Sequence, residues 1–379
     1  MHLIKSAFFF LKLIFFPVKV DYVLISLNHF NRVGGKNHFL EPIYQRLLLS
    51  KKSVLYIEDT DLKGAYQNFP RSNHAVGFDF ITFCFVLLTK IGFSRFSTIK
   101  FLRKVFLRNL RYKYLINMAG YTLGFFAEMF PERIHFELQH GLVFNNREWW
   151  MQKEWNHYPN CGILLHGQGF KDVLLSNEEY IIKPSSHLLI CGVDHKSIVY
   201  EPSSSSRSII FTEQITIDNS NSEINEYIDY FCYFLNQNQK FIVQNNITIF
   251  VKEHPRIPQN LSNRYKEYAF IRSIKDINSQ NLILAHLTFN SAAVFEYSIK
   301  GIPTIIIDGF DRRNPKFLFE TYKMPLQEFV VNPSISLEKS MSQLFQNQIF
   351  QNKSFELKNW ASNYSAPCND EIIEAIEQR

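Results

Sequence analysis

Short apolar runs alternate with apolar residues at helical spacing along most of this chain of 379 residues. Residues 23–27 and 53–57 are apolar runs of strand length, and residues 39–49 between them carry apolar positions at the spacing of a helix. A strand, a helix and a second strand within about 35 residues predict a βαβ unit, whose strands pair in parallel.

The same pattern continues to about residue 200, around one long helical stretch. Residues 78–113 predict a helix that is first apolar and then amphipathic and basic, and residues 114–130 predict its continuation up to Pro131. Three further strands are predicted at 134–138, 162–165 and 188–191, each with a glycine in the segment that follows. Repeated units of this kind are typical of a doubly wound domain, which we place at residues 21–200.

A serine-rich segment, EPSSSSR at residues 201–207, then predicts a linker. After it, the pattern predicts strands at 208–212, 247–252, 282–286 and 304–307, and helices at 223–236 and 292–300, the second of them capped by Gly301. We therefore expect a second Rossmann-like domain at residues 208–379. The predicted fold class is α/β, with two Rossmann-like domains facing a cleft.

Residues 1–20 form a segment of a different kind. Its apolar run, broken at Lys12, is shorter than the roughly 20 residues that a membrane span needs. Lys5, Lys12 and Lys19 recur every seven residues, so on a helix they would lie near one face with phenylalanines over much of the rest. This pattern predicts an amphipathic helix at the edge of a membrane, and a helix packed on the protein's own surface is the alternative.

Composition and charge narrow the class of protein. Apolar residues make up 46% of the chain and charged residues 20%, as in a globular protein with a large core. The five cysteines contain no CxxC pair, which argues against a disulfide framework or a zinc site and favours the cytoplasm. Residues 97–113 carry six basic residues and no acid, which predicts either a solvated helix face or a surface for anionic lipid or glycan. No nucleic-acid motif is present, so we expect no nucleic-acid partner.

The sequence KEHPR follows the predicted strand at 247–252. Pro255 cannot continue a strand ladder, so the chain must turn there. Lys252, His254 and Arg256 would then supply cationic and donor groups suited to a phosphate or diphosphate, although a plain basic loop is the alternative.

The sequence TFNS at residues 288–291 lies at a predicted junction of strand and helix. Thr288, Asn290 and Ser291 offer hydroxyl, amide and backbone N–H donors there, which predicts an anion site, with an ordinary helix cap as the alternative. Glu296, five residues further on, is placed to accept hydrogen bonds from ribose hydroxyls.

The sequence QHG at residues 139–141 follows a strand of the first half. His140 is a candidate general base, and Gly141 is expected to allow the tight turn that exposes it, whereas a structural histidine is the alternative. The acidic sequence EDTD at residues 58–61 reads mainly as a charged loop, with an Asp-x-Asp metal and nucleotide motif as the competing interpretation.

These motifs together resemble the bacterial surface-polysaccharide transferases of the GT-B fold. The shared pattern is strand-Gln-His-Gly, then Lys-x-His-Pro, then Ser-x-x-x-x-Glu followed by Gly-x-Pro-Thr, over roughly residues 130–310. This group includes the Kdo and sialic acid transferases of capsule and lipopolysaccharide and the teichoic acid glycerophosphotransferases. The resemblance implies that His254 and Ser291 bind donor phosphate and that His140 deprotonates the acceptor. The chain departs from it in having Ser291-Ala292 where some relatives have paired hydroxyls, and His140 where sialyl relatives often have an acid.

The resemblance implies an inverting glycosyltransferase that needs no metal and no cofactor. Its co-substrate would be a CMP-, CDP- or UDP-linked sugar, and its acceptor a lipid-linked or polyanionic glycan of capsule or lipopolysaccharide. The expected location is the cytoplasm, peripheral on the inner face of the plasma membrane. A CDP-glycerol-type glycerophosphotransferase and a non-catalytic glycan-assembly component are the alternatives.

Overall fold

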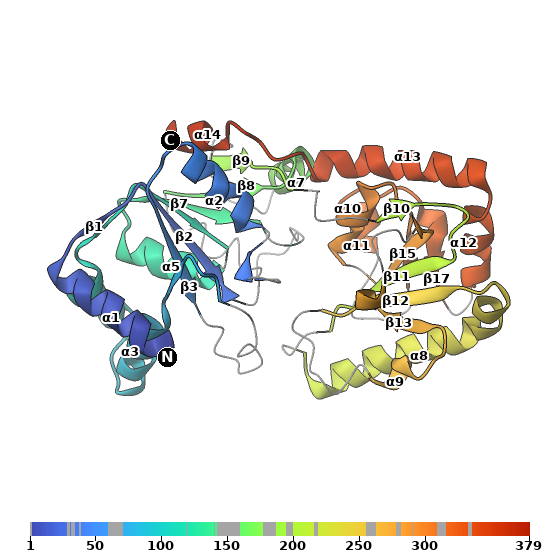
Figure 1. Ribbon diagram of the computed structural model, residues 1–379, viewed down its shortest axis with the longest axis horizontal. Helices are drawn as coiled ribbons and strands as arrows, with labels where there is room; N and C mark the ends of the chain where they lie inside the picture. Colours follow the sequence, from blue (N-terminus) through green and yellow to red (C-terminus); the bar gives the residue numbers. More distant parts are fainter. Residues whose placement is uncertain are drawn as a thin grey trace. The chain divides into compact units, whose positions relative to one another are not determined.

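The computed structural model describes residues 2–28, 31, 35–37, 39–59, 71–118, 120–139, 141, 160–176, 187–194, 200–215, 219–254, 263–277, 282–289, 291–308, 316–332 and 336–379. The chain divides into two compact units (Figure 1). Unit 1 comprises Met1–Asp194 with Ala366–Arg379, and unit 2 comprises His195–Ser365. Each unit is built around one large parallel sheet, so the predicted α/β class with two Rossmann-like halves is confirmed. The predicted cleft between the halves stays a prediction.

The large sheet of unit 1 has seven strands in the order β4–β3–β2–β6–β7–β8–β9. All neighbouring strands are parallel. Their bounds are β2 (Tyr22–Leu27), β3 (Val54–Asp59), β4 (Ala75–Gly77), β6 (Tyr114–Asn117), β7 (Ile134–Leu138), β8 (Cys161–Leu165) and β9 (Leu188–Ile190). Every residue of β2 is buried, because a parallel sheet is covered on both faces, and its sequence is therefore an almost continuous apolar run. A separate short pair joins β1 (Val18–Lys19) to β5 (Leu110–Arg111).

The helices of unit 1 form two groups. α2 (Leu40–Leu49), α5 (Gly120–Met129), α7 (Gln168–Leu175) and α14 (Ile372–Glu377) pack on strands of the sheet. The second group consists of α1 (His2–Phe15), α3 (Asp79–Lys90), α4 (Arg95–Leu102) and the π-helical turn η3 (Arg103–Leu107), which pack on one another. In the part of the chain that the structure describes, no helix is both long and apolar enough to cross a membrane.

The large sheet of unit 2 has six strands in the order β13–β12–β11–β15–β16–β17, again all parallel. Their bounds are β11 (Ser208–Thr212), β12 (Thr248–Lys252), β13 (Ile271–Ser273), β15 (Ala285–Thr288), β16 (Thr304–Ile307) and β17 (Val330–Val331). A short separate pair joins β10 (Glu201–Pro202) to β14 (Leu282–Ile283).

The helices of unit 2 include α8 (Asn221–Gln244), which begins with a capping box between Ser220 and Glu223. The others are α9 (Asn263–Lys266), α10 (Ala293–Ser298), α11 (Lys316–Glu320), α12 (Leu337–Leu344) and α13 (Asn347–Tyr364), with 3₁₀ turns η6 (Ile274–Asp276) and η7 (Gln327–Phe329). Gly301 follows α10 with a φ of +77°, and its N–H donates to the Ser298 carbonyl at 2.8 Å, so the predicted glycine cap is confirmed.

The last fourteen residues belong to unit 1 rather than to the second half, in contrast to the predicted boundary of 208–379. Ile372, Ile373 and Ile376 of α14 are buried in the core under the unit 1 sheet. The Glu377 carboxylate accepts a hydrogen bond from Tyr22 and pairs with Lys52 at 2.7 Å. These contacts are long-range in sequence, which is why no local pattern predicted them.

Two predictions of local structure were also wrong, one in each unit. The serine-rich segment 201–207 is not a linker, because β10 lies within it and pairs with β14, and its serines bind neighbouring backbone and side-chain groups of unit 2. The predicted helix over 114–130 contains a strand, β6, at Tyr114–Asn117. A short buried strand of a parallel sheet has no alternation, so periodicity could not separate it from a buried helix.

The predicted helix of residues 78–113 is also broken. Gly92, with a φ of +98°, separates α3 from α4. The predicted N-terminal helix exists as α1, and one side of it packs on the protein, as the alternative interpretation proposed.

Candidate functional site

Both large sheets have a switch point, where successive connections leave the first strand in opposite directions. In unit 2, the chain runs outward from β11 through β12 to β13 and then returns to β15 on the other side of β11. In unit 1, the same reversal occurs between β2 and β6. Crevices beyond the carboxyl ends of strands at such points are where open α/β sheets bind ligands.

Lys252, the last residue of β12, reaches the helix that follows β15. Its Nζ lies 3.2 Å from Glu296 Oε2 and 5.4 Å from the centre of the Tyr297 ring, both on α10. Burial acts to lower the pKa of Lys252, but Glu296 outweighs it and the pKa is raised, so the amine is charged. The two side chains keep 40% and 42% of their surface exposed, so solvent reaches this ion pair.

The turn after β15 is fixed by hydroxyl groups. Thr288 Oγ1 donates to the Thr212 carbonyl of β11 at 3.4 Å, across the switch point. The Ser291 N–H donates to Thr288 Oγ1 at 3.3 Å, and Ser291 Oγ accepts from the Ala293 N–H at 3.2 Å. Ser291 therefore shapes the turn locally, and the six-residue α10 is shorter than the predicted helix.

A buried histidine lies beneath this turn. His286 Nε2 is 2.9 Å from Thr212 Oγ1, its Nδ1 is 3.2 Å from Thr304 Oγ1, and its ring stacks on Tyr297. Burial lowers the pKa of His286 well below its usual range, so the ring is neutral. His286 thus joins β11, β15 and β16 at the base of the candidate site as a structural residue.

Glu213, directly after β11, is a residue that the sequence interpretation missed. Its side chain is fully buried, its Oε1 accepts a hydrogen bond from the Tyr265 hydroxyl, and its carboxylate accepts one from the His254 backbone. Burial raises the pKa of Glu213 to about 7, an effect that these hydrogen bonds only partly offset. An acid immediately after a predicted strand was the signal that could have identified it.

The structure describes most, but not all, of the donor-site residues predicted in the second half. Lys252, His254, Thr288, Ser291 and Glu296 lie at or just beyond the carboxyl ends of β12 and β15, which flank β11. Arg256 and Asn290 lie outside the described residues.

In unit 1, His140 also lies outside the described residues, but both of its sequence neighbours are placed. Gln139 is fully buried, its Nε2 donates to the Gly141 carbonyl at 2.8 Å, and its Oε1 accepts from the His166 N–H at 2.9 Å. Among the residues that the structure describes, none lies within 4 Å of a Cβ built on Gly141. Gln139 thus ties the backbone of Gly141 to that of His166. The expectation that Gly141 allows a tight turn stays a prediction, because His140 and residues 142–159 lie outside the described residues.

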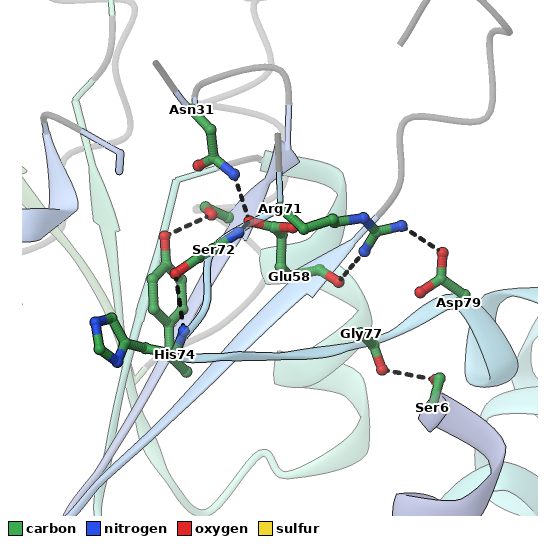
Figure 2. A network of polar contacts seen from close by, with 10 residues as sticks. Ser6, Asn31, Glu58, Arg71, Ser72, His74, Gly77 and Asp79 are labelled. Atoms are coloured by element: carbon green, nitrogen blue, oxygen red, sulfur yellow. Dashed lines mark hydrogen bonds and ion pairs between the residues drawn. The ribbon is translucent and has the colours of Figure 1, made fainter. Parts of the chain in front are cut away.

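The acidic sequence at 58–61 is not simply a charged loop. Glu58 and Asp59 are the buried last residues of β3, and Asp61 lies outside the described residues. Figure 2 shows Glu58 held by Asn31, whose Nδ2 donates at 2.5 Å, by the Ser72 N–H at 3.2 Å and by Arg71. Arg71 also donates to Asp79 at 2.6 Å.

This network explains the burial of a carboxylate in unit 1. Burial raises the pKa of Glu58, and the Asn31, Ser72 and Arg71 donors act in the opposite direction. Asp59 accepts a hydrogen bond from Thr82 Oγ1 of α3 at 3.0 Å. Both acids therefore tie β3 to the segment around α3, and a burial this complete is typical of structural acids.

No protein-family model and none of the curated proteins matches the chain. Solved structures do match it. A variant of the wall teichoic acid polymerase TagF has a TM-score of 0.55 at 12% identity, over 94% of this chain and 88% of that one.

Two further solved structures match at similar levels. A putative UDP-N-acetylglucosamine 2-epimerase from Listeria monocytogenes has a TM-score of 0.54 at 9% identity, over 95% of this chain and 96% of that one. The S. aureus MnaA–UDP co-structure has a TM-score of 0.51 at 10% identity, over 95% and 94%. At these identities the likeness establishes the fold, and the chain has the two-Rossmann fold of the GT-B class.

Proposed function

We propose that this protein is a glycosyltransferase that moves a sugar from a nucleotide-activated donor to a bacterial surface glycan of capsule or lipopolysaccharide. The reaction is inverting and needs no metal or other cofactor. The donor site is in unit 2, and the acceptor site is in unit 1.

The observation that carries the proposal is the gathering of donor-type residues at the switch point of the unit 2 sheet. Lys252 and His254 come from the end of β12, and Thr288 and Ser291 from the end of β15. The sequence motifs that contain these residues lie more than 30 residues apart in the chain. Their convergence at the place where α/β sheets bind nucleotides supports a nucleotide-activated donor.

Donor binding and proton transfer are carried out by different residues in this proposal. His254, Ser291 and Lys252 bind the donor phosphates, with Arg256, Thr288 and Asn290 completing the donor set. Binding opens the exposed Lys252–Glu296 pair, which frees Lys252 for phosphate and Glu296 for the ribose hydroxyls. His140, after β7, takes the proton from the acceptor hydroxyl as this hydroxyl displaces the nucleotide from the anomeric carbon.

A second candidate reaction is glycerophosphate transfer from a CDP-activated donor. The likeness to TagF favours it, and one of the matching TagF structures, with a TM-score of 0.52, was soaked with CDPG. The same phosphate-binding groups would serve both reactions, so the nucleotide and the transferred group separate them. A non-catalytic glycan-assembly component with this fold would bind nucleotide or glycan without turnover.

The acceptor is a lipid-linked or polyanionic glycan at the inner face of the plasma membrane, where the protein is a peripheral cytoplasmic enzyme. The basic residues between 97 and 113 support an anionic acceptor or surface.

The proposal is tested by thermal shift with CMP, CDP, UDP, GDP and ADP. A ligand that binds only the folded state stabilises it by about 2.7 kcal/mol at a hundredfold excess over its dissociation constant. We expect one nucleotide to raise the melting temperature of the wild type and of the control variant His74→Ala, whose histidine is exposed in unit 1, but not of His254→Ala. A CMP response favours Kdo or sialic acid, CDP favours glycerophosphate, and UDP favours a hexose.

Nucleotide response retained in full by His254→Ala would show that the donor site is elsewhere. No response from well-folded wild-type protein would contradict a nucleotide-activated donor and favour the binding-component alternative.

A further inference from the structure

Helix α1 is apolar on two opposite sides. Its inner side is buried on unit 1 at Ser6, Phe10 and Leu13, whose exposed fractions are 0%, 0% and 1%. Its outer side carries another apolar row at the spacing of one helical face, with exposed fractions from 46% to 75%: Ile4, Phe8, Leu11 and Phe15. A soluble helix normally buries its apolar positions, and α1 leaves this second apolar row exposed.

The outer row is held in place by the way α1 is attached. Ser6 Oγ donates to the Gly77 carbonyl at 2.6 Å (Figure 2) and accepts from the Phe80 N–H at 3.0 Å. At the other end, Asn109 Nδ2 donates to the Leu13 and Ile14 carbonyls at 3.1 and 2.8 Å. Both ends of α1 are therefore bonded to unit 1, and the outer row is a fixed surface rather than part of a loose tail.

The helices α3 and α4 and the turn between them also expose large apolar side chains. α1 packs on α3 (Figure 1), and α3 packs on α4. The exposed large apolar residues of these two helices and the turn between them are Phe83, Leu87, Ile91, Phe93, Phe96 and Phe101, with exposed fractions from 43% to 63%. We call this set, with the outer row of α1, the α1–α3–α4 surface. Soluble monomers rarely expose apolar patches of more than a few hundred Å², and larger ones mark interaction sites.

The charges on the helices of the α1–α3–α4 surface are basic except for Asp79, the first residue of α3, which pairs with Arg71. Residues 2–20 contain three lysines and no acid, and residues 80–127 contain eight basic residues and no acid. Lys5, Lys12, Lys90, Lys100 and Lys104 are exposed among them. The nearest acids that follow, Glu128 and Glu132, accept hydrogen bonds from Arg95 and Arg103. An apolar surface with a basic rim is complementary to an anionic bilayer, whose headgroups attract lysines while its acyl region takes phenylalanines.

We infer that the α1–α3–α4 surface docks on an anionic lipid bilayer, with α1, α3 and α4 lying in the interface. A second copy of this chain fits less well, because a self-complementary contact would bring these unbalanced basic residues together. This inference deepens the proposed function, on which it rests, because it assigns the surface that would hold the enzyme at the membrane beside a lipid-linked acceptor.

Vesicle co-sedimentation of the full chain tests this inference without any nucleotide. Phosphatidylcholine vesicles with and without about 30% phosphatidylglycerol, an anionic lipid that gives the surface a negative potential, are compared for four proteins. These are the wild type, Phe8→Gln/Phe15→Gln in α1, Phe83→Gln/Leu87→Gln in α3, and the matched control Phe355→Gln/Val243→Gln on exposed positions of α13 and α8 in unit 2. Glutamine is a good helix former, so exposed helices should tolerate it.

We expect the wild type and the unit 2 control to bind anionic vesicles, and to bind neutral ones more weakly. Each surface variant should lose at least about tenfold in partitioning, because it removes two large side chains from the apolar phase. All four proteins should keep the same nucleotide response in thermal shift, so a failed docking result and a failed donor assignment are distinguishable.

Three results would overturn the inference. The first is a folded wild type that binds neither kind of vesicle. The second is equal binding by the surface variants and the unit 2 control, or loss confined to the α1 variant. The third is a wild-type dimer, measured by light scattering without lipid, that the surface variants convert to monomer, since a second copy would then cover the surface.

Discussion

Replacing Glu213 by glutamine should stabilise the protein at alkaline pH. The Glu213 side chain is fully buried beside Tyr265, and burial raises its pKa from 4.5 to about 7. In the unfolded chain the carboxyl ionises at its ordinary pKa, so between these two values the folded state binds the proton more tightly than the unfolded state. The stability that Glu213 contributes as a neutral acid is therefore present below about pH 4.5 and is lost as the pH rises to about 7.

The size of the effect follows from the shift. Each pKa unit corresponds to 1.36 kcal/mol, so ionised Glu213 costs the folded state about 3 kcal/mol at pH 8. Glutamine has nearly the same shape, accepts the Tyr265 hydrogen bond through its amide oxygen, and does not ionise. We expect Glu213→Gln and the wild type to have similar free energies of unfolding at pH 4.5, and the variant to gain on the wild type up to pH 8.

The assay is urea unfolding at half-unit steps between pH 4.5 and 8, with the difference between variant and wild type taken at each pH, so that other titrating groups cancel. Glu320→Gln, at an exposed position in unit 2, is the control and should differ from the wild type by less than about 0.5 kcal/mol throughout. A difference for Glu213→Gln that does not change with pH, or that falls as the pH rises, would refute the reasoning.

Three other predictions concern the candidate site and the fold. His140→Ala should lower kcat by about 10²–10⁴-fold with little change in donor KM, whereas His254→Ala should lower kcat and raise donor KM. The same kinetic pattern in the two variants would contradict their separate roles. Gly141→Ala should change the free energy of unfolding by less than about 0.5 kcal/mol, because no described residue lies within 4 Å of a Cβ built there. Gly192→Ala should cost at least about 2 kcal/mol, since Gly192 has a φ of +74° and its Cβ would lie 2.0 Å from a carbonyl oxygen; equal effects in chemical denaturation would refute this. Removal of Ala366–Arg379 should destabilise unit 1, which limited proteolysis should detect as faster cleavage within residues 1–194. A cleavage pattern unchanged from that of the full chain would show that α14 is dispensable.

Much of the fold could be predicted from sequence because parallel strands have a strong local signature. Strands buried on both faces are short apolar runs, and the segments at 134–138, 208–212 and 304–307 were predicted with the bounds that the structure gives them. The same signature failed for β6, since a buried run of four residues is equally compatible with helix. The prediction of a linker at residues 201–207 failed because serine hydroxyls, which are common in linkers, also hydrogen-bond the backbone groups of a tight turn.

The candidate site was predicted in part for a related reason. Residues just after strands meet at one edge of a parallel sheet, so Lys252, His254, Thr288 and Ser291 could be grouped from their positions alone. Their mutual contacts could not be foreseen, because the Lys252–Glu296 pair depends on how α10 packs beside β12.

By itself, the sequence determined most strands of the two large sheets and the chemical groups at their ends, because these depend on neighbours within a few residues. The tertiary structure alone decided that α14 completes unit 1, that Glu213 is buried beneath the His254 backbone, and that α1 keeps a second apolar side uncovered. Each of these depends on contacts between residues far apart in the chain, and such contacts are set by the packing of whole elements, which no local pattern records.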